Sequence, residues 1–407
     1  MKCLLLTPFV PHPPIDGGRV RMLALLEALA ERCEVDVLAL AREERDREAV
    51  AALRERGFDV EAVFEEQPSP VAIARGVARG SSLYLAKYRS RRFGEALAAR
   101  LRASRYDVVQ CEYPYTGQYR LSTPRSGARW VLDAHNVEHS LSRQLGELSG
   151  QGRPIYRLYA RRETAARRRE EVNICRAMDA VVTVSENDRA ALAAVVPGLR
   201  PAVVANGVDL DRFSPDRERE SARPTGVFVG KLDYRPNVDA LRWLTSAIVP
   251  QVRRRIPEFE LIVVGSGDSR HVESWCREPG VRFVGPVEDV LPHLQEAWVA
   301  VAPLRAGSGT RLKILEALAA GCAVVTTPVG HEGLETVADK HLLVASDTDG
   351  FAESVARLCL EPELRLRVAH AGRELVEQRY GWGRAGDLLV TLYEGLIDRV
   401  EVSCLGG

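Results

Sequence analysis

The amino-acid sequence predicts an α/β protein built of two similar halves. Along its 407 residues, short apolar β-branched runs alternate with longer stretches of helical periodicity. Each half opens with a strand, a glycine-containing loop and a helix, at Lys2 and again at Gly226. Between the halves, residues 211–224 are rich in charge and proline and have no periodicity, which is typical of a domain boundary.

In the first half, Lys2–Thr7 has the pattern of a buried strand, followed by a proline-rich loop that ends at Gly17 and Gly18. Further strands are expected at 34–40, 59–64, 107–111, 130–133, 180–184 and 201–205. Helices are expected at 19–32, 42–56, 92–103 and 153–171, and another is expected to begin after Ser185. Residues 113–129 are interpreted as a loop.

The second half repeats this alternation. Its expected strands are 226–229, 260–264, 281–284, 297–302, 322–327 and 342–345. Its expected helices are 240–255, 310–320, 351–360 and 363–379, with a last helix whose apolar residues run from 388 to 400. Gly321 stands where a glycine commonly ends a helix.

The composition excludes several classes of protein. The net charge is zero, which argues against general attraction to nucleic acid. The eight cysteines are scattered without a C-x-x-C pair, so we expect reduced thiols and no structural zinc site. The N-terminal apolar run is too short for a signal peptide, and no apolar run approaches about 18 residues. We therefore expect a cytoplasmic protein without a membrane span.

The loop before the helix at 310–320 has the features of an anion site. Gly307, Ser308, Gly309 and Thr310 follow a strand, where free backbone N–H groups and a helix dipole favour negative charge. Two positive side chains, Arg311 and Lys313, are predicted in the first helical turn, where the dipole disfavours them. A bound phosphate would remove that conflict.

Glu316 is the second unusual residue of this helix. It is predicted near the apolar face, where a carboxylate needs partners such as ribose hydroxyls. The competing interpretation is an ordinary surface pair between Lys313 and Glu316, three residues apart on a helix.

Other loops carry weaker signals. Gly17 and Gly18 precede a helix that starts with arginine, and either a phosphate contact or a tight turn explains them. Two more positive residues, Lys231 and Arg235, follow the first strand of the second half and could reach a phosphate. The Gly265-Ser-Gly267 pair lacks the third glycine of a nicotinamide fingerprint, so it is weak support for a dinucleotide.

His135 and Asn136 come just after the strand at 130–133. The carboxyl edge of a parallel sheet faces the ligand crevice, so His135 could bond a sugar hydroxyl or phosphate, or act as an acid or base. The alternative is that Asp133, His135 and Asn136 only cap the following helix.

The helix at 153–171 carries seven arginines interleaved with apolar residues. Such a helix can lie on an anionic lipid surface as a peripheral contact. The favoured interpretation is a solvated helix in which Glu163, Glu170 and Glu171 pair with the arginines.

With these motifs the chain resembles the GT-B glycosyltransferases, specifically glycosyltransferase family 4. The resemblance rests on Pro303–Gly330, on Asn206-Gly-Val-Asp209, on Asp133-Ala-His-Asn-Val-Glu138, and on a helix after Tyr380-Gly-Trp382. It implies two Rossmann-like domains facing across a cleft, with the C-terminal helix crossing back to the first. The acceptor-binding domain would be 1–205 plus 383–402, the linker 206–224 and the nucleotide-sugar domain 225–380.

The resemblance also implies the activity: transfer of a sugar from a nucleoside-diphosphate-sugar donor to a hydroxyl acceptor, with retained configuration and without metal or cofactor. In that comparison Glu316 holds the ribose and Val287 meets the base. Gly18 approaches the donor phosphate or the acceptor, Lys231 pairs with the diphosphate, and His135 lies near the transferred sugar. Of these and the loop residues, His135, Lys231 and Arg311 are the predicted catalytic residues.

Two positions depart from the family pattern. Ser308 stands where the family often has a glutamate that touches the sugar, and Pro236 stands where it often has a lysine. Two alternatives therefore stay open: a nucleotide-sugar epimerase with the same fold, and a non-catalytic nucleotide-sugar-binding protein. The sequence names neither the sugar, the base nor the acceptor.

Overall fold

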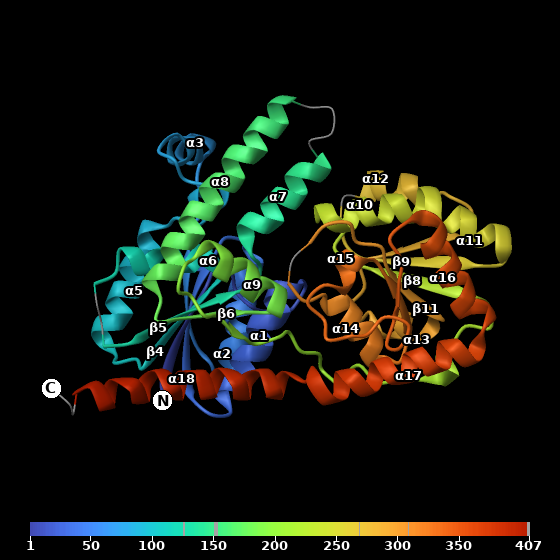
Figure 1. The fold of residues 1–407 in the computed structure, drawn as a ribbon. Helices are drawn as coiled ribbons and strands as arrows, with labels where there is room; N and C mark the ends of the chain where they lie inside the picture. Colours follow the sequence, from blue (N-terminus) through green and yellow to red (C-terminus); the bar gives the residue numbers. More distant parts are fainter. Residues whose placement is uncertain (125–126, 150–153, 268, 308, 405–407) are drawn as a thin grey trace. The chain divides into compact units, whose positions relative to one another are not determined.

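A computed structural model describes residues 1–124, 127–149, 154–267, 269–307 and 309–404 (Figure 1). The chain forms two compact units. Unit 1 consists of Met1–Ala205 and Trp382–Gly407, and unit 2 of Asn206–Gly381. Each unit contains its own parallel sheet with helices packed against it, so the α/β fold with two Rossmann-like domains is confirmed.

Unit 1 is built on a seven-stranded sheet in the order β3-β2-β1-β4-β5-β6-β7. Its strands are β1 (Lys2–Thr7), β2 (Glu34–Ala41), β3 (Asp59–Phe64), β4 (Val108–Glu112), β5 (Arg129–Ala134), β6 (Ala180–Thr183) and β7 (Ala202–Val203). All pairs are parallel, and Leu4 in β1 lies opposite Asp36 in β2 and Val109 in β4. Side chains of β1 alternate between two core clusters: Leu4 and Leu6 enter one, Cys3 and Leu5 the other. Both faces of this sheet are therefore covered.

The helices of unit 1 are α1 (Gly17–Ala30), α2 (Arg45–Glu55), α3 (Pro70–Ala78), α4 (Leu83–Tyr88), α5 (Arg91–Ala103), α6 (Tyr113–Gly117), α7 (Glu138–Ser149), α8 (Pro154–Ala177), α9 (Glu186–Val195) and α18 (Trp382–Cys404). α18 belongs to unit 1 together with the first half of the chain. Leu389 and Tyr393 of α18 are fully buried in the core cluster that contains Leu25 and Leu29 of α1. The apolar spacing of the last helix is thus explained by packing on α1.

The loop expected at 113–129 is wrong for its first part. Tyr113–Gly117 is helical as α6, and a 3₁₀ turn continues through Gln118–Leu121. Tyr113 and Tyr115 are buried and stack on each other with ring centroids 5.1 Å apart. Because its aromatic rings are buried, this short segment lies in the core. Its buried backbone polar groups must be hydrogen-bonded, and a helical turn provides those bonds.

Unit 2 has a six-stranded sheet in the order β10-β9-β8-β11-β12-β13. Its strands are β8 (Thr225–Val229), β9 (Glu260–Val264), β10 (Val281–Gly285), β11 (Val299–Ala302), β12 (Ala323–Thr326) and β13 (Leu343–Val344). Its helices are α10 (Arg235–Trp243), α11 (Val249–Arg255), α12 (Ser269–Trp275), α13 (Leu291–Glu296), α14 (Leu312–Ala319), α15 (Pro328–His331), α16 (Thr348–Leu360) and α17 (Pro362–Arg379). Residues 206–224, expected as a linker, lie within unit 2.

The single helix expected at 240–255 is interrupted. A π-helical turn, Leu244–Ile248, separates α10 from α11, because Pro250 has no backbone N–H for the regular ladder. Gly321 follows α14 with φ +71°, which is the left-handed conformation expected of a glycine after a helix. In the described part of the chain, no helix has both the length and the apolar character required to cross a membrane.

Candidate functional site

Each sheet reverses its strand order at one point, and ligands of such sheets bind outside the carboxyl ends of the strands there. In unit 1 the reversal lies between β1 and β4, and in unit 2 between β8 and β11. The loops after these strands contain Lys231, Gly307, Gly309, Thr310 and Arg311, and the helices that follow them contain Gly17, Gly18, Arg235, Lys313 and Glu316.

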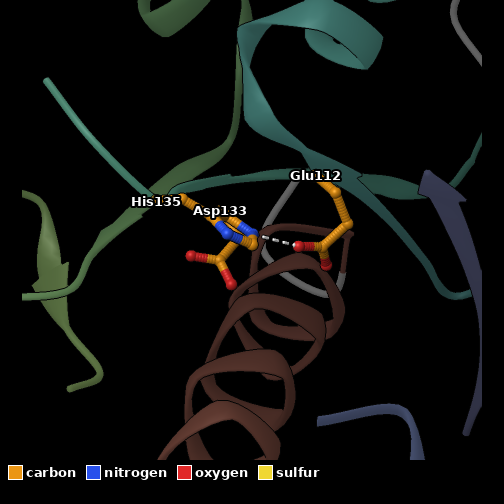
Figure 2. Close-up of side chains that lie close together, drawn as sticks. All are labelled: Glu112, Asp133 and His135. Carbon is orange, nitrogen blue, oxygen red and sulfur yellow. Dashed lines mark hydrogen bonds and ion pairs between the residues drawn. The ribbon is translucent and has the colours of Figure 1, made fainter. Parts of the chain in front are cut away.

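In unit 1, three buried side chains meet at the ends of β4 and β5 (Figure 2). His135 Nε2 lies 2.6 Å from Glu112 Oε2, and both residues are buried. Burial raises the pKa of Glu112 to about 7 and lowers the pKa of His135, because each charged form loses its hydration. The pair can therefore share one proton near neutral pH.

Asp133 has a different partner. Its two carboxylate oxygens accept hydrogen bonds from Arg21 Nε and Nη2 at 2.9 and 3.0 Å, and both residues are buried. The helix-capping interpretation of Asp133 is therefore wrong: the carboxylate turns to α1 and not to α7. Glu112, Asp133 and His135 could form a metal-binding set, but Arg21 already supplies the positive charge beside Asp133. These residues thus do not fit a metal ion.

A chain of hydrogen bonds links the Glu112–His135 pair to the last helix. Gln110 Nε2 donates to Glu112 Oε1 at 2.5 Å, and Tyr393 of α18 donates its hydroxyl hydrogen to Gln110 Oε1. Sequence reasoning missed Gln110, Glu112 and Tyr393. The only available signal was the spacing of Gln110 and Glu112, which puts two polar residues on one face of a buried strand.

Gly18 lies against a second ring of this cluster. Tyr113 has a φ of +64° and stacks on His135 with ring centroids 3.8 Å apart. A Cβ at Gly18 would lie 2.3 Å from the Tyr113 hydroxyl oxygen, so only glycine fits there. Asp16 caps α1 by accepting from Arg19 N, which places a negative charge beside Gly17 and weakens the phosphate interpretation of this turn. Asn136 follows His135 ahead of α7.

In unit 2, Lys313 connects the two loops at the strand reversal. Its Nζ donates to Asn237 Oδ1 at 2.8 Å, and Asn237 Nδ2 donates to the carbonyl of Lys231 at 2.9 Å. Burial lowers the pKa of Lys313 to about 7. Because Lys313 turns to Asn237, the surface pair with Glu316 is not formed in the described part of unit 2. Lys231 itself is exposed, and its Nζ lies 3.6 Å from Asp233 Oδ2.

Arg311 differs from the expectation. The helix begins at Leu312, so Arg311 is its N-cap residue and does not lie in the first turn. Its buried guanidinium donates to the carbonyls of Gly309 and Val329. A Cβ at Gly307 would lie 2.9 Å from Arg311 Nη2, so the glycine allows the arginine to pack against the loop. Arg311 thus stabilises the conformation of the loop at Gly307–Thr310 through buried hydrogen bonds.

The remaining predicted residues lie around this loop. Thr310 is buried, and its carbonyl accepts from Asn206 Nδ2 at 3.3 Å. Glu316 is half-buried, and the loss of hydration raises its pKa. Arg235 starts α10, and Val287 is half-exposed after β10. Gly265 has a φ of +153° and packs directly on the carbonyl of Gly230. Ser308 lies outside the described residues.

Comparisons with known proteins agree for both units. Residues 15–212 match the family model described as Glycosyltransferase Family 4, and residues 223–361 match Glycosyl transferases group 1. A phosphatidyl-myo-inositol mannosyltransferase of Propionibacterium freudenreichii is 29% identical over 232 residues, 53% of this chain and 56% of that protein. A GDP-mannose-dependent α-(1-6)-phosphatidylinositol monomannoside mannosyltransferase of Mycobacterium tuberculosis is 30% identical over 242 residues, 53% of this chain and 62% of that protein.

Solved structures show the same fold. Sucrose-phosphate synthase of Thermosynechococcus elongatus has a TM-score of 0.74 at 18% identity, covering 98% of this chain and 100% of that one. Anabaena HepE in complex with UDP and glucose has a TM-score of 0.71 at 14% identity, covering 97% and 100%. The matches span little more than half the length of the two mannosyltransferases named above. No epimerase is among the proteins named here.

Proposed function

Since the chain belongs to the GT-B glycosyltransferases of the family 4 type, we propose that it transfers a sugar from a nucleoside-diphosphate-sugar donor to a hydroxyl acceptor. The observation that carries the proposal is the Lys313–Asn237–Lys231 connection at the strand reversal of unit 2. It brings an ammonium group and the end of α14 to the edge where such sheets bind ligands. A relative named as GDP-mannose-dependent and a neighbour bound to UDP and glucose support the donor class.

In this proposal unit 2 binds the donor. Negative charge builds up on the diphosphate as the glycosidic bond breaks, and Lys231, Lys313 and the backbone amides of Gly309 and Thr310 stabilise it. Glu316 accepts hydrogen bonds from the ribose, and Val287 and Gly265 lie beside the nucleotide. Arg311 is assigned a positioning role because its guanidinium is occupied by loop carbonyls.

In unit 1, His135 is the residue that we assign to sugar binding. When Glu112 is ionised, it accepts a hydrogen bond from His135 Nε2–H. The two buried carboxylates are engaged, Asp133 by Arg21 and Glu112 by His135. We therefore assign neither as a nucleophile: the acceptor attacks on the face that the nucleotide leaves, the configuration is retained and no metal is required.

The test begins with a thermal-shift screen of GDP- and UDP-sugars, since a bound donor raises the melting temperature. With the best donor, we expect Lys231→Ala combined with Lys313→Met to lower kcat/KM by roughly 10²- to 10⁴-fold, because two charge-assisted hydrogen bonds are lost. Arg254→Ala is the control, an exposed arginine on α11 of the same unit. Turnover that survives the double substitution would contradict the proposal.

A further inference from the structure

One face of α8 exposes large apolar side chains. Ile155 is 85% exposed, Leu158 69% and Tyr159 41%, and their spacing places them on neighbouring positions of the helix. The opposite face is covered by α7: a Cβ at Gly146 would lie 3.0 Å from Ala160 Cβ, and Ser142 Oγ is 3.0 Å from Thr164 Oγ1. At about 100° per residue, Ile155 and Leu158 point away from the Ala160 side. Figure 1 shows α7 and α8 running together as a pair of long helices in unit 1.

The glutamates of α8 do not lie on this exposed apolar face. Glu163 accepts from Leu83 N and from Arg167 Nε, and Glu171 accepts from Glu138 N; both glutamates are buried. The expected pairing with an arginine is found at Glu163, which binds Arg167, but this pair is buried, so the expectation of a solvated helix with its glutamates at the surface is wrong. Glu170, half-buried, accepts from Ser81 Oγ and Ser82 N.

Between residues 154 and 172, the exposed charged side chains of α8 all carry positive charge. They are Arg157, Arg161, Arg162, Arg168 and Arg169. With the glutamates turned inward, these charges have the same sign across the whole surface of this part of the helix.

α3 extends the same surface. Its sequence is largely apolar, yet none of its residues is buried, and Val71 is 65% exposed. Its charged side chain, Arg75, and the following Arg79 are both exposed. Arg162 and Arg169 of α8 donate to the carbonyls of Val77 and Gly80, so the two helices are joined. A mainly apolar helix without a buried residue indicates a partner.

We propose that the apolar residues Ile155, Leu158, Tyr159 and Val71, with Arg75, Arg161, Arg162 and Arg169 beside them, form a basic–apolar face that docks on an anionic lipid bilayer. Arginines bind lipid phosphates while the apolar side chains enter the interface, and the two effects add. A nucleic acid would use the arginines but leave the aliphatic side chains in water. The bilayer is the partner whose chemistry uses both kinds of side chain.

Vesicle sedimentation tests the proposal with the full chain. We expect binding to phosphatidylcholine vesicles that contain phosphatidylglycerol, weakening with added salt, and no binding to pure phosphatidylcholine. Arg75→Ser with Arg161→Ser weakens partitioning by about thirtyfold, at about fivefold for each arginine near the surface. Ile155→Ser with Leu158→Ser weakens it by at least about tenfold.

Matched controls use exposed residues of the same kinds elsewhere in the chain. Arg102→Ser with Arg105→Ser removes two positive charges from unit 1, and Val337→Ser with Leu360→Ser removes two exposed apolar side chains from unit 2. Both control proteins should bind like the unchanged chain, and all variants should keep its melting temperature.

Three results would overturn the proposal. The first is the absence of binding to anionic vesicles, and the second is vesicle binding that both face variants retain. The third is binding to heparin, an acidic polymer, together with vesicle binding that does not depend on Ile155 and Leu158. The nucleotide thermal shift is a separate measurement on unit 2. Failure on vesicles with a normal nucleotide shift would therefore reject this surface and leave the transferase proposal intact.

Discussion

The imidazole of His135 and the carboxyl group of Glu112 form a buried pair, with Nε2 2.6 Å from Oε2. They lie at the ends of adjacent strands, β5 and β4, and are 23 residues apart in the chain. The ring of Tyr113 covers the imidazole. The protonation state of this pair decides whether His135 can accept a hydrogen bond from a ligand.

A Glu112→Gln substitution should change how stability depends on pH. Burial raises the pKa of Glu112 from 4.5 to about 7, so its contribution to stability is complete below pH 4.5 and is lost as the pH rises through 7. Glutamine does not titrate, so only the unchanged chain should lose this stability. The melting temperature of the variant minus that of the unchanged chain should therefore increase between pH 4.5 and 7. The full effect is at most about 3 kcal/mol. If this difference in melting temperature instead decreases as the pH rises, Glu112 and His135 form an ion pair with the proton on His135.

Lys313 predicts a pH dependence of nucleotide binding. Its pKa is lowered to about 7 by burial, so the free protein carries a neutral amine at higher pH. A diphosphate requires the ammonium form, so affinity for GDP or UDP should fall between pH 7 and 9, by at most about tenfold per pH unit. Calorimetry in buffers of different ionisation enthalpy should show proton uptake on binding. Lys313→Arg keeps the charge and should bind independently of pH; an equal dependence in both proteins would exclude Lys313 as its source.

Gly265 should be the more sensitive of two glycines with positive φ. A Cβ at Gly265 would lie 1.9 Å from the carbonyl oxygen of Gly230, whereas at Gly57 nothing lies within 4 Å. Gly57→Ala adds only the cost of a left-handed residue, about 1–2 kcal/mol. Gly265→Ala must also displace the backbone, and we expect a loss above about 3 kcal/mol in urea unfolding. Equal losses of stability would mean that the backbone at Gly230 moves away from the new Cβ at little cost in free energy.

Two adjacent leucines test the packing of α18. Leu389 is fully buried in unit 1 and Leu388 is 43% exposed. Leu389→Ala should lower the free energy of unfolding by about 2–5 kcal/mol, because it leaves a cavity against α1. Leu388→Ala should cost less than about 1 kcal/mol. Similar losses at both positions would show that α18 does not pack on unit 1 in solution.

The sequence predicted the strands well because parallel strands covered on both faces are continuous apolar runs. The expected bounds of β1, β3 and β9 agree with the structure. α6 was missed, since Tyr-Pro-Tyr-Thr-Gly has the composition of a turn and only its buried rings make it part of the core.

Side-chain partners were harder to predict than elements. Arg311 was expected in the first turn of the helix, but α14 begins two residues later than expected, and its guanidinium donates to backbone carbonyls. Glu163 looked solvated because its partner, the backbone of Leu83, lies 80 residues away. Hydrophobic periodicity predicts which face of a helix or strand a residue lies on. It does not predict which other part of the chain packs against that face.

The return of α18 to unit 1 affects the order in which the chain can fold during synthesis. Domains usually fold as they leave the ribosome, the N-terminal one first. Here the face of α1 that receives Leu389 and Tyr393 must wait until all of unit 2 has been translated. The nascent first half therefore carries an uncovered apolar surface, on which a chaperone would be expected to act.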